Sequence, residues 1–175
     1  MQQPHSEVTG PSVAWLDELE DARAVAELRT CCAAEEWVQT MLAHRPFGTL
    51  DRLLDAGEAA VMAMDDDALQ QALDAHPRIG ERRLGVGRED AWSRTEQAGA
   101  LTADDDLQAR LAEGNRAYEE RFGHVFLIRA AGRSAQEMYD ALQARLAHDE
   151  TTERSVVRDE LAEIVRLRLV KLVSG

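Results

Sequence analysis

The residue of this chain best suited to proton transfer is His76, which stands directly before Pro77. It follows a stretch with helical apolar periodicity over residues 65–75. Proline disfavours helical geometry in the residue before it, so we expect His76 at a helix end, with its ring off the regular helical face. An imidazole, with an unperturbed pKa of about 6.5, can exchange protons at neutral pH if it reaches a cleft. On position alone, a surface histidine that happens to end a helix is the commoner case.

A carboxylate that could partner this histidine is Glu96, which follows Ser93 by three residues. One interpretation is that the two form a capping box, in which Glu96 only satisfies the start of a helix. The other is that Glu96 faces His76 across a cleft, where it would orient the imidazole and raise its pKa. The two roles are compatible, and the sequence slightly favours the cap.

Arginines supply a candidate anion site. Arg168 lies on the apolar side of the last predicted helix, where a buried guanidinium requires a charged partner or a ligand. The alternative is a side chain whose head group snorkels into water. Further arginines in glycine-containing loops could bind a carboxylate, although pairing with local acids is favoured for most of them individually. In or just beyond residues 76–90 these are Arg78, Arg82, Arg83, Arg88 and Arg94.

Length, composition and charge exclude several classes of protein. The chain has 175 residues, of which 45% are hydrophobic and 30% charged, as expected of one soluble globular domain. Its net charge of −13 argues against a nucleic-acid partner and against docking on an anionic membrane. No apolar run is long enough to span a membrane, and the N-terminus lacks a signal-peptide core. We therefore expect a cytoplasmic protein.

The residue types also argue against cofactor chemistry. Lys171 is the only lysine, which argues against chemistry that needs a Schiff base. Cys31 and Cys32 are adjacent and have no second pair at zinc-ligand spacing, so we expect at least one of them in the core rather than at a metal. We expect no metal and no organic cofactor.

Helical periodicity runs through most of the chain and predicts an all-α fold, a single-domain bundle of about eight helices. Residues 1–12 are predicted to form a flexible N-terminal tail and residues 13–175 the helical domain. The one strand-like run, at residues 125–128, is too short and isolated to build a sheet, and a buried helical segment or an extended linker are the alternatives. Helices are expected over residues 15–32, 34–44, 50–64, 65–75, 102–122, 134–148 and 151–173.

Taken together, these segments resemble the 2-oxo-4-hydroxy-4-carboxy-5-ureidoimidazoline (OHCU) decarboxylases, enzymes of urate breakdown. The resemblance covers roughly residues 15–173 and depends most on His-Pro-Arg-Ile-Gly at 76–80 and Glu-Gln-Ala-Gly at 96–99, in this order and spacing. The other matching pieces are Cys31-Cys32 with Trp37-Val38, Arg45-Pro46-Phe47, Asn115 with Tyr118, Arg121-Phe122-Gly123, and residues 126–134 and 163–169.

The resemblance implies an all-helical, generally dimeric enzyme that uses no cofactor and converts OHCU, a small molecule, into (S)-allantoin. It implies that His76 is the catalytic histidine and Glu96 its acidic companion, and that Arg168 binds anionic groups of the substrate. His124 and Arg129 depart from the more apolar character expected of their stretch, and an inward-facing Arg129 would alter substrate preference. The other implied substrate-binding residues are Pro77, Ser93, Arg94, Thr95, Gln97, Phe126, Leu127, Ile128, Arg129 and Ala130.

The chemistry of this reaction agrees with the residue types. The substrate carboxylate sits on a carbon that bears a hydroxyl, next to a ring carbon–nitrogen double bond, so the ring supplies its own electron sink. The enzyme has only to orient the carboxylate, exclude water and deliver a proton to one face of the ring. We expect His76 to exchange that proton, Glu96 to hold the tautomer of His76, and Arg168 to anchor the anion.

Two other functions fit the same residues. A hydrolase of a related ureide ring, in which His76 and Glu96 activate water, would give a ring-opened product without releasing carbon dioxide. A helical interaction module, whose arginine-rich loops bind an acidic partner, would have an exposed loop face and no enclosed pocket. Its binding would weaken with added salt.

Overall fold

The structure is a computed structural model that describes residues 10–80, 88–101 and 103–175. Within these ranges the chain forms ten α-helices and no strand, and eight of the helices have seven residues or more. The predicted all-α class and the predicted number of substantial helices are therefore confirmed. The helices are α1 (Val13–Glu18), α2 (Asp21–Arg29), α3 (Glu35–Ala43), α4 (Leu50–Ala63), α5 (Asp66–Asp74), α6 (Arg88–Glu96), α7 (Ala98–Leu101), α8 (Asp105–Phe122), α9 (Ala135–Leu146) and α10 (Glu150–Ser174).

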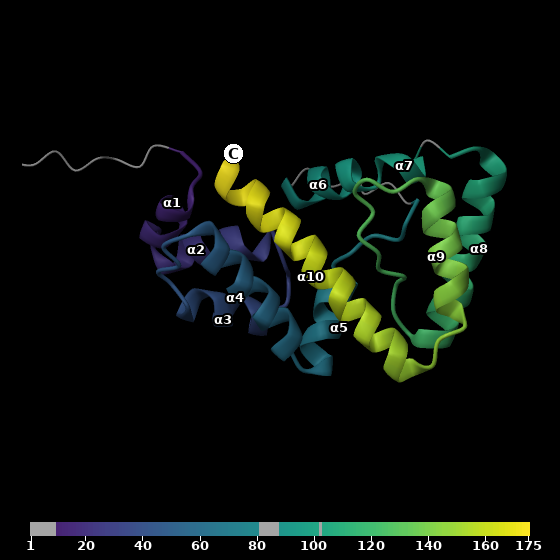
Figure 1. Cartoon of the computed structure of the whole chain (residues 1–175), viewed down its shortest axis with the longest axis horizontal. Helices are drawn as coiled ribbons and strands as arrows, with labels where there is room; N and C mark the ends of the chain where they lie inside the picture. The colour runs from purple at the N-terminus through teal and green to yellow at the C-terminus, as the bar shows by residue number, and fades with distance from the viewer. Residues whose placement is uncertain (1–9, 81–87, 102) are drawn as a thin grey trace, which may run out of the picture.

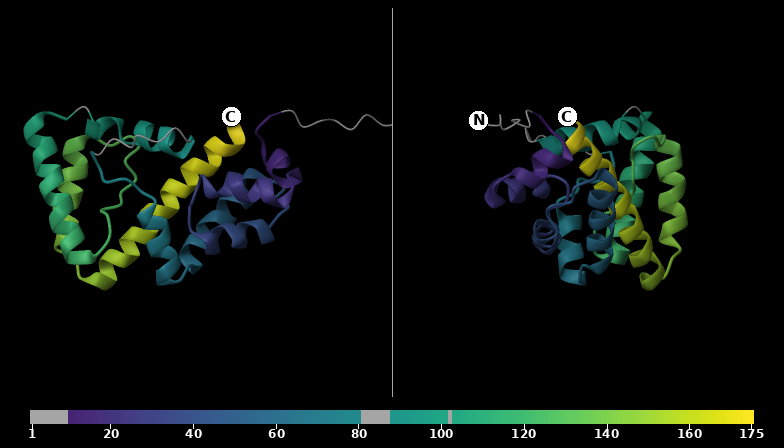
Figure 2. Two further views of the ribbon diagram at one scale, coloured as in Figure 1. Left: turned by 180° about the vertical axis from the view of Figure 1, so that it is seen from behind. Right: turned by 60° about the vertical axis from the view of Figure 1, so that its left-hand side comes forward.

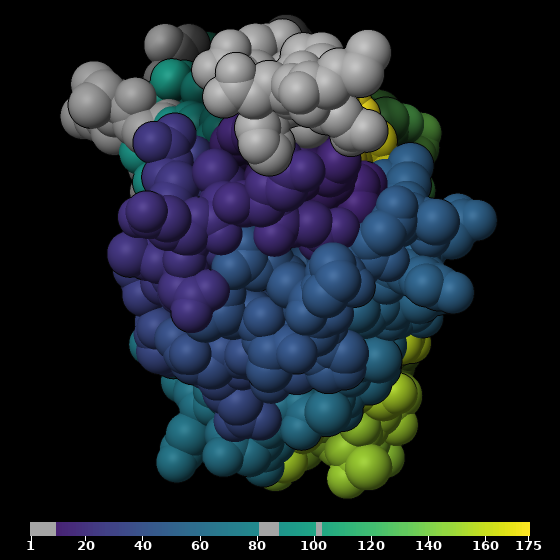
Figure 3. Space-filling model, turned by 90° about the vertical axis from the view of Figure 1, so that its left-hand side faces the viewer, coloured from purple at the N-terminus to yellow at the C-terminus, as the bar shows by residue number. Residues whose placement is uncertain are grey.

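The C-terminal helix α10 runs diagonally through the middle of the molecule (Figure 1). Helices α1 to α4 lie on one side of it and α8 and α9 on the other, an arrangement that two further views confirm (Figure 2). Seen from the end formed by the first five helices, α10 is visible only at the margin of the surface (Figure 3). Because neighbours cover so much of it, α10 contributes buried side chains along nearly its whole length, from Glu153 to Val173.

Two hydrophobic cores flank this central helix. The larger contains Trp37, Leu53 and Leu161 and joins the first five helices to α10. Helices α4 and α10 approach closely at Gly57, where an added Cβ would lie 2.6 Å from Leu169 Cδ1. The smaller core contains Tyr118 and Met138 and joins α8 and α9. Burial of both clusters fixes where the site residues of α10 lie.

Several predicted helix starts are confirmed by their capping hydrogen bonds. The side chain of Thr49 accepts from the backbone N–H of Arg52 at 3.3 Å, and that of Asp65 from Ala68 at 2.8 Å. Ser134 caps α9 in the same way, accepting from the N–H of Glu137 at 3.1 Å. Each bond satisfies one of the donors that a helix N-terminus leaves unpaired.

Two predicted elements differ from the structure. The helix expected over residues 15–32 breaks at Leu19, where the chain is extended, because the guanidinium of Arg45 binds the carbonyls of Leu16 and Leu19, each at 2.8 Å. The long helix expected from residue 102 begins instead at Asp105, capped by Asp104, whose side chain accepts from Leu107 N at 2.8 Å. Residue 102 itself lies outside the described residues.

The remaining predictions concern the chain end and the cysteines. Residues 1–9 of the expected tail lie outside the described residues, and Ser12 already caps α1, accepting from Trp15 N at 3.0 Å.

Cys31 and Cys32 are both buried in the larger core, as expected. Burial raises the pKa of the Cys31 thiol to about 12 and that of Cys32 to about 11, so both stay protonated at neutral pH. In the described part of the chain, no helix combines the length and apolarity required to cross a bilayer.

Candidate active site

Four separate parts of the chain meet around a small cavity of about 20 Å³: the end of α5, helix α6, the extended segment 126–130 and helix α10. A second cavity, of about 220 Å³, adjoins it and shares His76, Ser93 and Arg168 with it. The smaller space holds no more than about one or two water molecules, so any larger ligand must also use the neighbouring cavity. The small cavity is lined by His76, Pro77, Ile79, Ser93, Glu96, Gln97, Phe126, Leu127, Ile128, Ala130, Ile164 and Arg168.

His76 lies at the end of a helix, as the following proline predicted. Helix α5 ends at Asp74, and the backbone N–H of His76 donates to Leu73 O at 3.0 Å in a last, tightened turn. The side chain is half-buried and contributes to the walls of both cavities. His76 is therefore not a fully exposed surface residue, and its catalytic role stays a prediction.

Ser93 and Glu96 do not form a capping box. Helix α6 already begins at Arg88, so both residues lie inside it, and Glu96 is its last residue. Their partner is Arg168, 72 residues further along the chain from Glu96: its Nε donates to Glu96 Oε1 and its Nη2 to Glu96 Oε2, both at 3.1 Å. The same Nη2 donates to Ser93 Oγ at 3.1 Å.

The pair of Glu96 and Arg168 is nearly enclosed, since their side chains are only 10% and 7% exposed. Two parallel hydrogen bonds between a guanidinium and a carboxylate form the strongest and most directional ion pair available to side chains. The expectation that Arg168 requires a charged partner is thus confirmed, and the snorkelling alternative is wrong. Glu96 and His76 line the same cavity, and the orientation of the imidazole by Glu96 stays a prediction.

The loop that follows His76 is held from both sides. The backbone N–H of Gly80 donates to Gln97 Oε1 at 3.1 Å, and Asn115 Nδ2 donates to the carbonyl of Ile79 at 2.9 Å. Gly80 has a φ of +88°, a conformation that residues with a Cβ rarely adopt. The two side chains that make these bonds, Gln97 and Asn115, are both buried. They fix the His-Pro-Arg-Ile-Gly segment against α6 and α8.

A glycine also explains the second motif. An added Cβ on Gly99 in α7 would lie 2.4 Å from the backbone carbonyl oxygen of Arg133, a distance that no relaxed structure tolerates. The Glu-Gln-Ala-Gly segment therefore ends in glycine because α7 packs directly on the turn before α9.

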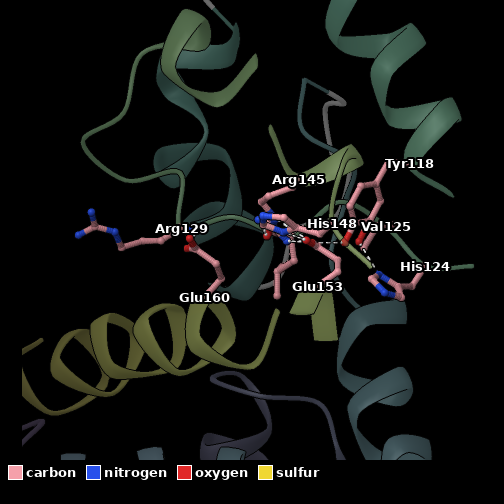
Figure 4. Close-up of polar contacts among 9 residues, drawn as sticks. Tyr118, His124, Val125, Arg129, Arg145, His148, Glu153 and Glu160 are labelled. Carbon is pink, nitrogen blue, oxygen red and sulfur yellow. Dashed lines mark hydrogen bonds and ion pairs between the residues drawn. The ribbon is translucent and has the colours of Figure 1, made fainter. Parts of the chain in front are cut away.

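The strand-like run at residues 125–128 is an extended segment whose polar backbone groups bind side chains instead of another strand (Figure 4). Arg145 Nη1 donates to Leu127 O at 2.6 Å, and Arg129 N donates to Glu160 Oε2 at 2.8 Å. Arg133 Nε donates to Arg129 O at 2.9 Å. Buried backbone groups must find such partners, and here α9, α10 and the turn before α9 supply them.

Behind this segment lies a buried polar network centred on Glu153 (Figure 4). Glu153 Oε1 accepts from Tyr118 Oη at 2.6 Å and from Arg145 Nε at 2.7 Å, while Oε2 is 3.0 Å from His148 Nδ1. Burial alone would raise the pKa of the Glu153 carboxyl, but the bonds from Arg145 and Tyr118 outweigh it and hold that pKa below its usual value. Burial and the neighbouring carboxylate raise the pKa of Tyr118.

The sequence analysis did not place Arg145 or Glu153 in a functional role. A signal for Glu153 was present, because it precedes Val157 by four residues and Leu161 by eight and so falls on the buried side of α10. An acid in that register requires a buried cation as a partner. No local pattern identifies Arg145 as that cation.

Three residues implied as substrate contacts lie outside the wall of the small cavity. Arg94 and Thr95 are exposed on α6, and the Thr95 hydroxyl donates to Ala91 O at 3.0 Å. The Arg129 side chain is 38% exposed, lies 3.0 Å from Glu163 and points away from the buried network (Figure 4). An outward Arg129 leaves the expected substrate preference unchanged, and the roles of all three residues stay predictions.

Two arginines of the loop region pair with acids that are remote in sequence. Arg78 Nε lies 2.7 Å from Glu119 of α8, and Arg88 binds Glu27 of α2. Pairing with acids was the favoured interpretation for most of these arginines, and the structure shows it for these two, with partners on α8 and α2. Arg82 and Arg83 lie outside the described residues.

Comparison with known proteins places these findings in a family. Residues 17–170 match the sequence model of the OHCU decarboxylase family. The chain is 30% identical over 152 residues to the uric acid degradation bifunctional protein TTL of Arabidopsis thaliana, covering 85% of this chain and 47% of that protein. The chain thus spans about half the length of this relative.

Two further proteins are similar over nearly their full length. The OHCU decarboxylase of Haloferax volcanii is 30% identical over 141 residues, which is 79% of this chain and 82% of that protein. A crystal structure of an OHCU decarboxylase in the presence of (S)-allantoin superimposes with a TM-score of 0.75 at 27% identity, covering 90% of this chain and all of that one. The matched region contains every residue that lines the small cavity, and the chain belongs to the OHCU decarboxylase family.

Proposed function

We propose that this protein is a carboxy-lyase that decarboxylates OHCU to (S)-allantoin in urate degradation, the activity for which its family and its relative from Haloferax volcanii are named. The observation that carries the proposal is the buried Glu96–Arg168 pair in the wall of one cavity with His76. An interaction module requires neither an enclosed cavity nor a buried ion pair beside it, so this geometry favours an enzyme.

Decarboxylation breaks the bond between the hydroxyl-bearing ring carbon and the carboxylate. The electron pair left behind moves toward the adjacent carbon–nitrogen double bond, and the nitrogen takes up one proton. Transfer of the hydroxyl proton to the neighbouring ring carbon then forms the carbonyl and the new stereocentre. The protein has to hold the ring so that this last proton arrives on one face.

We assign these tasks to three residues. The Arg168 guanidinium anchors the substrate carboxylate in the bidentate manner that it uses with Glu96. His76, in the wall between the two cavities, exchanges the proton. Glu96 orients the imidazole and fixes its tautomer. Since OHCU is larger than the small cavity, it occupies the space of both cavities, and its entry excludes water from the reacting carbon.

The test is a coupled reaction followed by circular dichroism. Urate, urate oxidase and hydroxyisourate hydrolase generate OHCU in place, and this protein is then added. We expect rapid growth of the (S)-allantoin signal with one carbon dioxide released per turnover. His76→Ala should slow it by about 10²- to 10⁴-fold, the usual contribution of a general acid or base.

His44→Ala is the matched control, because His44 is an exposed histidine at the end of α3 whose ring only binds Thr40 O at 2.7 Å. It should keep full activity. Decay to racemic allantoin at the rate without protein would refute the proposed function, and a ring-opened product without carbon dioxide would indicate a hydrolase. Near-normal turnover of His76→Ala would remove His76 from the mechanism.

We further propose that the protein acts as a homodimer in the cytoplasm on a small molecule, without nucleic acid or membrane as partner, and that residues 13–175 form its one domain. The net charge of −13 supports the absence of polyanionic partners, which require a basic footprint. The homodimer follows from the family resemblance, and its measurement is given at the scale of the whole molecule below.

A further inference from the structure

Lys171, the only lysine of the chain, lies beside the buried ion pair of the candidate active site. Its Nζ is 3.8 Å from Glu96 Oε1, the same oxygen that accepts from Arg168 Nε at 3.1 Å. Lys171 follows Arg168 by three residues on α10, so both side chains lie on one side of that helix. Two cations therefore share one carboxylate.

The position of the ammonium group is defined by a second contact. Nζ lies 6.0 Å from the centre of the Trp92 ring, which belongs to α6 and is also covered by Arg88 at 5.3 Å. A cation over an aromatic face is attracted by the ring quadrupole. Lys171 does not line either cavity, and at 37% exposure its side chain lies between solvent and Glu96.

The charges of the site explain what this lysine adds. Arg168 and Glu96 neutralise each other, so a substrate carboxylate entering the cavity brings a negative charge that no second arginine or lysine balances among the described residues of the cavity wall. The chain as a whole is already strongly acidic. Arg29, in the wall of the adjacent cavity, has its charge opposed by Glu35 at 2.9 Å. With Lys171 included, Glu96, Arg168 and the bound anion together carry no net charge.

The hydrogen bonds point to the moment at which Lys171 acts. In this structure Arg168 gives two N–H groups to Glu96 and shares one of them with Ser93. A substrate carboxylate that binds Arg168 at the Nε–Nη2 edge, in the bidentate manner proposed above, displaces Glu96 from that edge. We propose that Lys171 holds the Glu96 charge when this exchange occurs, and that it is a positioning residue for substrate binding. This role depends on the proposed function.

Three variants in the coupled assay test the role. Lys171→Gln removes the charge, Lys171→Arg keeps it, and Arg166→Gln makes the same change in net charge at an exposed position of α10. We expect Lys171→Gln to raise the KM for OHCU by about 3- to 10-fold with kcat within about twofold, as suits a partly exposed ion pair. Lys171→Arg and Arg166→Gln should match the wild type.

Each other outcome overturns the proposal in a distinguishable way. An unchanged KM in Lys171→Gln, with an active wild type, refutes the role of Lys171 alone. An equal rise in KM for Arg166→Gln assigns the effect to overall charge, and loss of kcat with a lower melting temperature in both Lys171 variants assigns it to folding. A wild type that does not accelerate allantoin formation refutes the proposed function, and the role of Lys171 with it.

Discussion

At the scale of single residues, the site is defined by one exchangeable ion pair. Arg168 is buried, and its Nε and Nη2 donate to Glu96 and Ser93, although it is also the residue that we propose to bind the substrate. A buried guanidinium without such a partner would be costly. In the proposed function, Glu96 occupies the anion site until the substrate arrives, and the same carboxylate serves stability in the empty protein and chemistry in the loaded one.

This double role predicts that stability and activity separate in a pair of variants. Glu96→Gln should lower the free energy of unfolding by about 3 kcal/mol, because Arg168 is left charged and buried beside a neutral amide. Adding Arg168→Met should recover most of that loss, since no unpaired charge remains, while activity stays absent. Urea denaturation and the coupled assay measure the two quantities. A double variant less stable than both single variants would contradict this interpretation.

At the scale of elements, the extended segment 126–130 depends on side chains of neighbouring helices. Arg145 of α9 binds its backbone at Leu127, and Glu153 of α10 holds Arg145 in place. Arg145 also covers the Phe126 ring, with its guanidinium carbon 4.6 Å from the ring centre. The part of the cavity wall formed by residues 126–130 therefore depends on this polar network for its conformation.

The pH dependence of stability should report on the network. The pKa of Glu153 is lower in the folded protein than its usual value of 4.5, so ionised Glu153 stabilises the fold above that pH. The contribution is lost as the pH falls through the lowered pKa. Glu153→Gln should therefore be less stable than the wild type at pH 7, with a difference that shrinks below about pH 4.

Urea denaturation at several pH values measures this difference, and Asp159→Asn, an exposed acid of α10, is the control. Glu27 also has a lowered pKa, because its bonds to Arg88 and Arg23 outweigh the opposing effect of burial. The contribution of the Glu153 network is therefore the pH-dependent change in the free energy of unfolding that Glu153→Gln shows and the control variant does not. A difference that does not change with pH would exclude an ionised Glu153 as its source.

The elements also show what sequence alone can predict. Thr49, Asp65 and Ser134 cap their helices through residues three positions away, and Pro77 ends α5 before His76, so local patterns suffice. The break at Leu19 depends on Arg45, 26 residues away, and has no local signal. Ser93 and Glu96 have the spacing of a cap, but their partner lies on another helix. Local patterns and the family motifs predicted the candidate site residues, whereas Arg145 required the tertiary structure.

At the scale of the whole molecule, one helix unites two cores and one site. α10 packs with the first five helices in the larger core, and its acids Glu153 and Glu160 bind groups on the other side. Neither side surrounds the small cavity by itself, because its walls come from both. The molecule therefore behaves as one domain around the site.

The homodimer is testable at this scale. Light scattering should give a mass of twice 19.4 kDa. Two chains that each carry a net charge of −13 repel one another, so any monomer present at low salt should decrease when salt is added. A mass of 19.4 kDa at every salt concentration and at micromolar protein would contradict the proposed assembly.

Because α10 contacts both sides of the molecule, the spacing between its contact residues is fixed. Four side chains of α10 make the contacts described above: Glu153, Glu160, Arg168 and Lys171. Glu153 and Arg168 are 15 residues apart, which at about 1.5 Å per residue is about 22 Å along the helix axis. Inserting a single residue between Glu153 and Arg168 would rotate every later residue of α10 by about 100° about the helix axis and shift it by about 1.5 Å along that axis. The buried network and the ion pair could then not both keep their partners. We therefore expect α10 to tolerate a substitution far better than the insertion of a residue.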